Sequence, residues 1–254
     1  NQMIIGRVKL QKGMINIYFT DGSTDSADYL VVSDGTFSGT KSVIEKKNFK
    51  PKYYGAIAVR TKIKTQDISN LDSNNISLIM GSDAHLILYP INQQKEFNLV
   101  CVIKKKEKDN ISIKTILENT ILKENKNLAN LFKRDLKSWP IYISNKPVKS
   151  IYKNVLYIGD AFYTFPPTMA QGASQSIEAA NEIFNLIINN SDEMQNQYFK
   201  NRVERTNLIN KRSKINYFSF HISNPLLKIL RNEFLKRLVK NRHFIHNYLG
   251  KVYK

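Results

Sequence analysis

The sequence predicts a mixed α/β fold, and three observations support this class. Apolar runs with strand character dominate residues 1–103, helical periodicity dominates from residue 193 onward, and a strand–loop–helix joint at 154–189 connects the two regions. The chain has 254 residues, which is enough for one large domain or two small ones. No apolar run reaches the length that crosses a bilayer, so we expect a soluble globular protein.

Residues 1–35 are predicted to form a β meander. The strand-like runs are MIIGRVKLQ, MINIYFT and DYLVVS. Two turn dipeptides, Lys12-Gly13 and Asp21-Gly22, lie between the runs and favour antiparallel pairing. The next segment, SDGTFSGTKSVI at 33–44, is predicted to be a Gly/Ser/Thr-rich loop after a buried strand.

The middle of the chain is predicted to supply the strands of a further sheet. The strand-like runs between residues 53 and 103 are YYGAIAVRTKI, SLIMG, HLILYPI and FNLVCVI. Residues 111–138 carry apolar side chains at helical intervals, which predicts a helical segment.

Three helices are predicted in the C-terminal part. The first runs from Gln171 to about Asn189, and residues 193–218 form a long polar helix. Asn224-Pro225 is typical of an N-cap followed by proline at the first helical position, and it starts a final amphipathic helix. In the first helix, the apolar residues expected to share one face are Ile177, Ala180, Phe184 and Ile187. In the last helix, the residues expected to face inward are Leu227, Leu230, Phe234 and Leu238.

The net charge of +18 raises the question of nucleic-acid binding. No helix-turn-helix, RNA-binding or zinc-finger signature accompanies this charge. The charge is concentrated at 200–254, where fourteen lysines and arginines stand against Glu204 and Glu233. A solvated basic helical tail, with contact to acidic membrane lipid as an option, is the plainer interpretation, so no nucleic-acid partner is expected.

The single cysteine, Cys101, lies inside an apolar strand-like run. This position predicts a buried thiol, and one cysteine excludes an internal disulfide. We therefore expect a cytoplasmic protein, and we assign no metal ligands.

The strand–loop–helix joint contains the residues best suited to hold a ligand. Asp160 follows the apolar strand NVLYIG and can accept hydrogen bonds from ligand hydroxyls, while Pro166-Pro167 makes a stiff wall. The predicted helix start at Gln171, Gly172 and Ala173 presents free N–H groups and the positive end of the helix dipole to an anion.

The whole segment GDAFYTFPPTMAQGASQSIEAANEI resembles the second flavin-binding motif of the single-component FAD-dependent aromatic hydroxylases, the salicylate-hydroxylase-like and ubiquinone-biosynthesis group. The resemblance implies that Gly159, Asp160 and Ala161 bind FAD, with Asp160 anchoring the ribitol. It implies that Pro167 packs beside the isoalloxazine, and that Gln171, Gly172 and Ala173 hold the pyrimidine end of the ring. The family commonly has histidine where Tyr163 stands, so we give Tyr163 no catalytic role.

A second segment, YLVVSDGTFSGTK, is similar to the Asp-Gly motif of the same family. Asp34, Gly35 and Ser38 align with this motif, and Lys41 stands in the place of an arginine. The resemblance implies that Asp34 and Gly35 lie near the flavin and contribute to nicotinamide binding, with NADH or NADPH as the reductant.

A third segment, DAHLILYPI, resembles a strand of the salicylate-hydroxylase-like branch in which a His-x3-Tyr pair lines the substrate pocket. Period-two alternation places His85, Ile87 and Tyr89 on one face of the strand. In this reading His85 removes a proton from a phenol and Tyr89 orients the hydroxyl. The C-terminal RVERTNLINKRSKINYFSFHISNPLLKILRN is similar to the tail of this branch, including a His-x-x-Asn-Pro-type turn.

The resemblance extends from Ser23 onward and implies a domain layout. A partial, Rossmann-like FAD-binding domain comprises 1–45 and 150–190, a mainly antiparallel β-sheet substrate domain is inserted at 46–149, and a helical segment follows at 191–254. The Gly-x-Gly-x-x-Gly motif of the family does not occur in the sequence. We therefore expect an N-terminally truncated chain that, expressed alone, does not bind FAD tightly.

The implied function is NAD(P)H- and O2-dependent hydroxylation of an aromatic, phenolic substrate through a flavin C4a-hydroperoxide. A small phenolic acid is the first substrate expectation, and the ring of a ubiquinone precursor at the inner face of a membrane is the next. The alternatives from other classes are a non-catalytic flavin-binding remnant and, more remotely, a basic nucleic-acid-binding protein.

Overall fold

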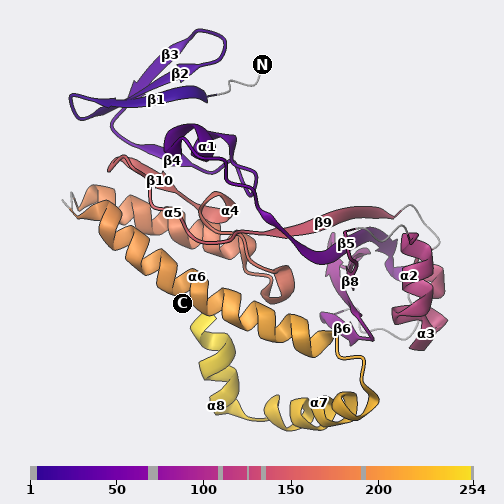
Figure 1. The fold of residues 1–254 in the computed structure, drawn as a ribbon. Helices are drawn as coiled ribbons and strands as arrows, with labels where there is room; N and C mark the ends of the chain where they lie inside the picture. Colours follow the sequence, from indigo (N-terminus) through magenta and orange to yellow (C-terminus); the bar gives the residue numbers. More distant parts are fainter. Residues whose placement is uncertain are drawn as a thin grey trace. The chain divides into compact units, whose positions relative to one another are not determined.

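The structure is a computed structural model that describes residues 5–67, 74–107, 111–124, 126–132, 136–189 and 193–252. Figure 1 labels the helices and strands along the chain, which divides into two compact units. Unit 1 comprises Asn1–Lys52 with Tyr142–Lys214, and unit 2 comprises Tyr53–Ile141 with Ile215–Lys254. Antiparallel sheets, a short parallel pair and a helical C-terminal part are all present, so the predicted mixed α/β class is confirmed.

The β meander at the start of unit 1 is a three-stranded antiparallel sheet of β1 (Ile5–Gln11), β2 (Met14–Phe19) and β3 (Thr24–Ala27). Its first turn has positive φ at both Lys12 (50°) and Gly13 (85°), the backbone that the right-handed twist of a tight hairpin needs. The prediction that residues 28–33 form the third strand of this meander was wrong. The third strand is β3, and the apolar run at 28–33 contributes β4 to another sheet.

That other sheet pairs β4 (Leu30–Val32) in parallel with β10 (Val155–Tyr157). The loop prediction for 33–44 was partly wrong, because α1 (Gly39–Glu45) forms within it and is N-capped by Ser38. After β10 come α4 (Gly159–Phe162), the 3-10 turn η3 (Pro167–Met169), α5 (Gly172–Ile188) and α6 (Met194–Phe220), which runs from unit 1 into unit 2. Leu156 of β10 packs with buried residues of α5 and α6.

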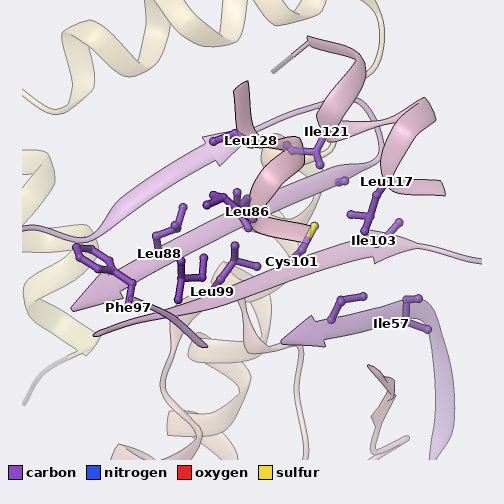
Figure 2. Close-up of a cluster of buried hydrophobic side chains, with 14 residues drawn as sticks. Ile57, Leu86, Leu88, Phe97, Leu99, Cys101, Ile103, Leu117, Ile121 and Leu128 are labelled. Carbon is purple, nitrogen blue, oxygen red and sulfur yellow. The ribbon is translucent and has the colours of Figure 1, made fainter. Parts of the chain in front are cut away.

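Unit 2 contains a five-stranded sheet in the order β6-β7-β8-β5-β9. The strands are β5 (Lys52–Lys64), β6 (Ser77–Met80), β7 (Ala84–Ile91), β8 (Glu96–Lys104) and β9 (Lys137–Ile143), and a 3-10 turn, η1 (Thr65–Asp67), follows β5. Figure 2 shows the apolar core on one side of this sheet, where Leu86, Leu88 and Cys101 meet Leu117 and Ile121. Cys101 is fully buried in this core, and burial raises the pKa of its thiol far above the ordinary value.

The segment predicted as one helix at 111–138 is broken. It contains α2 (Ile113–Asn119), α3 (Ile121–Glu124) and the 3-10 turn η2 (Lys126–Phe132), while residues 125 and 133–135 lie outside the described part. The range also overlaps β9, which begins at Lys137. Trp139-Pro140 fits this strand because β9 is at the edge of the sheet, where proline removes no interior ladder bond.

The C-terminal helices begin where the sequence predicted, but their apolar faces are arranged differently. In α5 the buried residues are Gln175, Ala179, Ile183 and Leu186, whereas Ile177 and Phe184 are 71% and 61% exposed. In α7 (Pro225–Leu238) the Asn224 side chain caps the helix by accepting from the Leu227 N–H at 3.1 Å, yet no residue of this fully described helix is buried. The inward prediction for α7 was therefore wrong. The chain continues as α8 (Arg242–Phe244), η4 (Ile245–Leu249) and η5 (Gly250–Val252).

None of the helices in the described ranges combines the length and the apolar character needed to cross a bilayer.

Candidate functional site

Two sequence motifs meet at the carboxyl edge of the parallel strands of unit 1. Tyr157 of β10 pairs with Val32 of β4, and the Ile158 N–H donates to the Val32 carbonyl at 3.0 Å. Because both strands run in the same direction, the segments that follow them leave the sheet at the same edge. The Asp34-Gly35 and Gly159-Asp160 segments are thus brought together across 124 residues of sequence.

The Asp34 segment forms a tight turn that starts α1. Gly35 has φ of 82°, and the Ser38 N–H donates to the Gly35 carbonyl at 3.1 Å. The Asp34 carboxylate accepts from the Thr40 N–H at 3.1 Å, and the Ser38 hydroxyl accepts from the Lys41 N–H at 3.0 Å. The first turn of α1 is therefore capped by this chain's own side chains.

Lys41, in the first turn of α1, joins the two motifs. It is 5% exposed, and its ammonium donates to the Ala161 carbonyl of α4 at 2.7 Å. Burial lowers the pKa of this lysine, and the charges of Asp34 and Glu45 oppose the shift. Lys41 thereby fixes α4 against α1.

Asp160 is the acid at the centre of this edge. Its carboxylate accepts from the Thr36 hydroxyl at 3.3 Å, and its carbonyl accepts from the Thr164 hydroxyl at 3.1 Å. Partial loss of hydration raises the pKa of the Asp160 carboxyl above the ordinary value, and the hydrogen bond from Thr36 opposes this. Since Asp160 is an exposed residue, its carboxylate retains capacity to accept further hydrogen bonds.

The N-terminus of α5 lies beyond η3 and the turn at Ala170. Gln171 occupies the N-cap position, but its side chain is 1% exposed, contacts Gln175, and makes no capping hydrogen bond in the described structure. Gly172 and Ala173 are exposed. A Cβ added at Gly172 would meet no described atom within 4 Å. The Gln171 side chain therefore leaves the first N–H groups of α5 uncapped, at the positive end of the helix dipole.

Pro167, Gly159 and Ala161 have different surroundings. Pro167 is exposed at the first position of η3, whereas Ala161 is fully buried and contributes its carbonyl to Lys41. Gly159 has φ of 55°, and a Cβ at this position would lie 2.4 Å from the Ser176 hydroxyl oxygen. Gly159 is thus required for the close packing of α4 on α5.

This geometry predicts opposite results at the two glycines. Gly159→Ala should lower the free energy of unfolding by roughly 2 kcal/mol, because the left-handed backbone and the contact with Ser176 both oppose a side chain. Gly172→Ala, the matched control, should change the stability by less than about 0.5 kcal/mol. Urea unfolding of both variants measures the difference, and equal stabilities would contradict the assignment.

In unit 2, His85 lies on the face of the sheet opposite to the core of Figure 2. Its Nδ1 is 2.7 Å from Nε2 of His221, and both residues are buried, with exposed fractions of 0% and 1%. Burial lowers the pKa of His85 to about 4 and, with the nearby His85 and Lys104, that of His221 to about 3. Both imidazoles are therefore neutral at pH 7 and share one hydrogen bond.

Tyr89 lies on the same face, four residues along β7. Its hydroxyl accepts from the Asn98 side chain at 2.5 Å. The strand rise places the Cα atoms of His85 and Tyr89 about 13 Å apart, so a ligand touching both lies along the strand.

Two cations that were not identified from the sequence lie on the same face of the sheet as His85 and Tyr89. Arg60 and Lys62 of β5 are exposed, and the register places them on this face.

Arg60 also contacts an aromatic ring of the neighbouring edge strand. Its guanidinium carbon lies 5.8 Å from the ring centroid of Trp139, which is 47% exposed. This contact is a cation–π arrangement, and it fixes a cation beside the aromatic and polar groups of the sheet.

Comparison with solved structures identifies the fold. The HpxO protein of Klebsiella pneumoniae, crystallised with FAD and uric acid, matches 99% of this chain and 66% of its own with a TM-score of 0.78 and 15% identity. A salicylate hydroxylase substrate complex matches 99% of this chain and 70% of its own, with a TM-score of 0.76 and 17% identity. The chain has the fold of these two proteins. The 2,6-dihydroxypyridine-3-hydroxylase of Arthrobacter nicotinovorans is also similar, with 88% of this chain and 66% of its own covered, a TM-score of 0.64 and 15% identity.

The chain spans about two thirds of the length of these structures. No family model matches the sequence, and no curated protein matches it either. At these identities the likeness establishes the fold, and it agrees with the expected partial flavin-binding fold combined with an antiparallel sheet and a helical C-terminal part.

Proposed function

We propose that this protein is an NAD(P)H- and FAD-dependent monooxygenase that hydroxylates an aromatic substrate with O2. One observation carries the proposal. The Asp160 carboxylate and the uncapped start of α5 lie in one segment, beside the Asp34 turn, in the fold of proteins crystallised with FAD. In this proposal unit 1 is the flavin-binding part and unit 2 is the substrate-binding part, with Tyr53–Ile141 as the inserted segment.

The residues present fit the flavin that the fold implies. FAD has a polyhydroxyl chain, which suits the free acceptor capacity of Asp160. The ring carries an edge that becomes anionic on reduction, which suits the uncapped start of α5 at Gly172 and Ala173, both of which are exposed. Pro167 is exposed between these two groups and is available to pack against a flat ring.

Bound FAD would supply the chemistry, which is to take two electrons from NADH or NADPH and to activate O2 for transfer of one oxygen atom. The residues of this chain would bind and orient the cofactor and the substrate and would shield them from solvent. Lys41 and Ser38 hold α1 and α4 in place through the Ala161 carbonyl and the helix cap. Asp160, Gly172 and Ala173 would hold the cofactor, and Asp34 with Gly35 would form the turn beside it.

His85 is proposed to accept the proton of a phenol at Nε2. For Nε2 to be the accepting atom, the His85 Nδ1–H must donate to Nε2 of His221, so His221 sets the tautomer. Both rings are neutral at pH 7, so Nε2 of His85 can accept a proton, but the burial that lowers the pKa of His85 to about 4 also weakens it as a base. Tyr89 is proposed to contact the other end of the substrate, with its hydroxyl held by Asn98.

A small phenolic acid is the substrate class that this face supports best. Arg60 provides a guanidinium for a carboxylate, and the Trp139 and Tyr89 rings provide aromatic surface. The uric acid of HpxO is likewise a planar ring compound, which is consistent with this choice. The ring of a ubiquinone precursor is the second candidate, and the exposed apolar side chains of α7 favour it.

The test is product analysis with the full-length protein, NADH or NADPH, O2 and a panel of phenolic acids. The proposal expects one NAD(P)H consumed for each hydroxylated product formed. Oxidation of NAD(P)H with peroxide as the only product, or with no product for any phenol, would contradict it.

Arg60→Gln tests the substrate class. The loss of one charge-assisted contact should raise KM for a phenolic acid by roughly tenfold or more. The corresponding phenolic amide should show no such change, because it has no carboxylate for Arg60 to bind. Equal KM changes for the acid and the amide would exclude Arg60 from carboxylate binding.

A further inference from the structure

Helix α7 presents large apolar side chains to solvent. Leu227, Leu230 and Phe234 recur at intervals of three and four residues and are 46%, 58% and 60% exposed. Leu226 and Ile229 in the same helix are 65% and 61% exposed. This spacing places Leu227, Leu230 and Phe234 on one side of the helix, and we call these three residues the α7 stripe. An apolar stripe of this kind on an exposed helix indicates a surface that a membrane or another molecule covers.

The C-terminal segment from Pro225 to Val252, which begins with α7, is strongly basic. It carries seven lysines and arginines against the single acid Glu233, a net charge of +6. Several of these cations lie within α7 itself, including Lys236 and Arg237 in its last turn. The buried centres of protein–protein interfaces are depleted of such charge. An apolar stripe combined with dense positive charge instead matches the boundary between anionic headgroups and acyl chains.

We propose that α7 is an interfacial helix that lies on the surface of an anionic lipid bilayer. The α7 stripe enters the boundary between headgroups and acyl chains, and Arg237 and Lys240 contact lipid phosphates. This inference goes beyond the proposed hydroxylation and does not depend on it, because it rests only on residues of unit 2 and needs no flavin. It gives the basic C-terminal part a task that the flavin site does not explain.

Co-sedimentation with vesicles tests the proposal. The full-length protein should sediment with vesicles of phosphatidylglycerol and phosphatidylcholine, and only weakly with phosphatidylcholine alone. Added NaCl should reduce the bound fraction, because salt screens exposed charges. The double variant Leu230→Ser/Phe234→Ser should bind the anionic vesicles at least about tenfold more weakly, since two apolar side chains are lost from the acyl boundary.

The matched control is Ile177→Ser/Phe184→Ser on α5 of unit 1. These two residues are as exposed as the pair on α7 and have similar chemistry, so the control removes a comparable apolar area elsewhere. The control should bind anionic vesicles like the wild type. Equal loss in both double variants, or no vesicle binding by the wild type, would overturn the proposal.

A fluorescent label measures which side of α7 meets the lipid. The native Cys101 is fully buried, so a thiol-reactive, polarity-sensitive dye labels a new surface cysteine. Leu230→Cys carries the dye on the stripe, and Asn232→Cys carries it about 200° around the helix. Anionic vesicles should shift the emission of the first label to shorter wavelength and leave the second unchanged. A shift that appears without vesicles and grows with protein concentration would indicate a second copy on the stripe and would overturn the proposal.

Discussion

Replacing Arg202 with alanine is expected to lower the free energy of unfolding by about 3 to 5 kcal/mol. Arg202 of α6 is 6% exposed and lies between two acids of α5, with its guanidinium 2.7 Å from Glu178 and 2.6 Å from Glu182. Arg205 also pairs with Glu178 at 2.9 Å. Burial raises the pKa of Glu178, but the hydrogen bonds from Arg205 and Arg202 outweigh it and hold the pKa below the ordinary value. Removal of Arg202 leaves partly buried negative charge without compensation, which is the costly part of the change.

Two further variants separate this effect from a general loss of charge. Lys236→Ala breaks an exposed pair with Glu233 and should cost less than about 1 kcal/mol. Arg202→Met/Glu182→Met removes both charges and should recover part of the stability lost in Arg202→Ala. Urea unfolding measures all three, and an Arg202→Ala cost similar to that of Lys236→Ala would show that this ion pair does not hold α5 to α6.

The second large effect is a loss of stability at acid pH caused by His85 and His221. Both pKa values are lowered in the folded protein, from 6.5 to about 4 and about 3, so the unfolded chain binds protons more readily than the folded one. Stability should therefore be complete above pH 6.5 and should fall as the pH drops from about 6.5, through the folded pKa of His85 near 4, to that of His221 near 3. The depression at His85 alone corresponds to about 3 kcal/mol.

The slope of stability against pH is checked by measuring the free energy of unfolding at several pH values. His85→Leu/His221→Leu should flatten the pH dependence of stability between about pH 6.5 and 3, whatever its stability at pH 7. His246→Gln, at an exposed position of unit 2, is the matched control and should keep the wild-type slope. A wild-type slope retained in the double variant would mean that other groups govern the acid loss.

Sequence patterns predicted the local parts of the site well. The turn at Gly35, the helix start at Gly172 and the N-cap Asn224 follow from residue types that act within a few positions, and the structure has all three. The likeness of the segment around Asp160 to a flavin motif also agreed with the fold. Local signals sufficed here because strand ends and caps are set by neighbouring residues.

Long-range partners could not be predicted in the same way. His221 lies 136 residues from His85, and only the His-x-x-Asn-Pro turn marked it in the sequence. Arg60 reaches the His85 face through strand register, which no single segment reveals. The apolar periodicity of α7 showed which residues share a side, but periodicity does not state whether another element covers that side.

The affinity of the full-length protein for FAD tests the central claim most directly, and quenching of flavin fluorescence measures it. We expect binding that Asp160→Ala weakens by roughly tenfold or more, because a carboxylate hydrogen-bonded to the cofactor is lost. Asp25→Ala, which removes an exposed acid of β3 in the same unit, should leave the affinity unchanged. Failure to bind FAD, or the same affinity in Asp160→Ala as in the wild type, would contradict the flavin site proposed for this edge of unit 1.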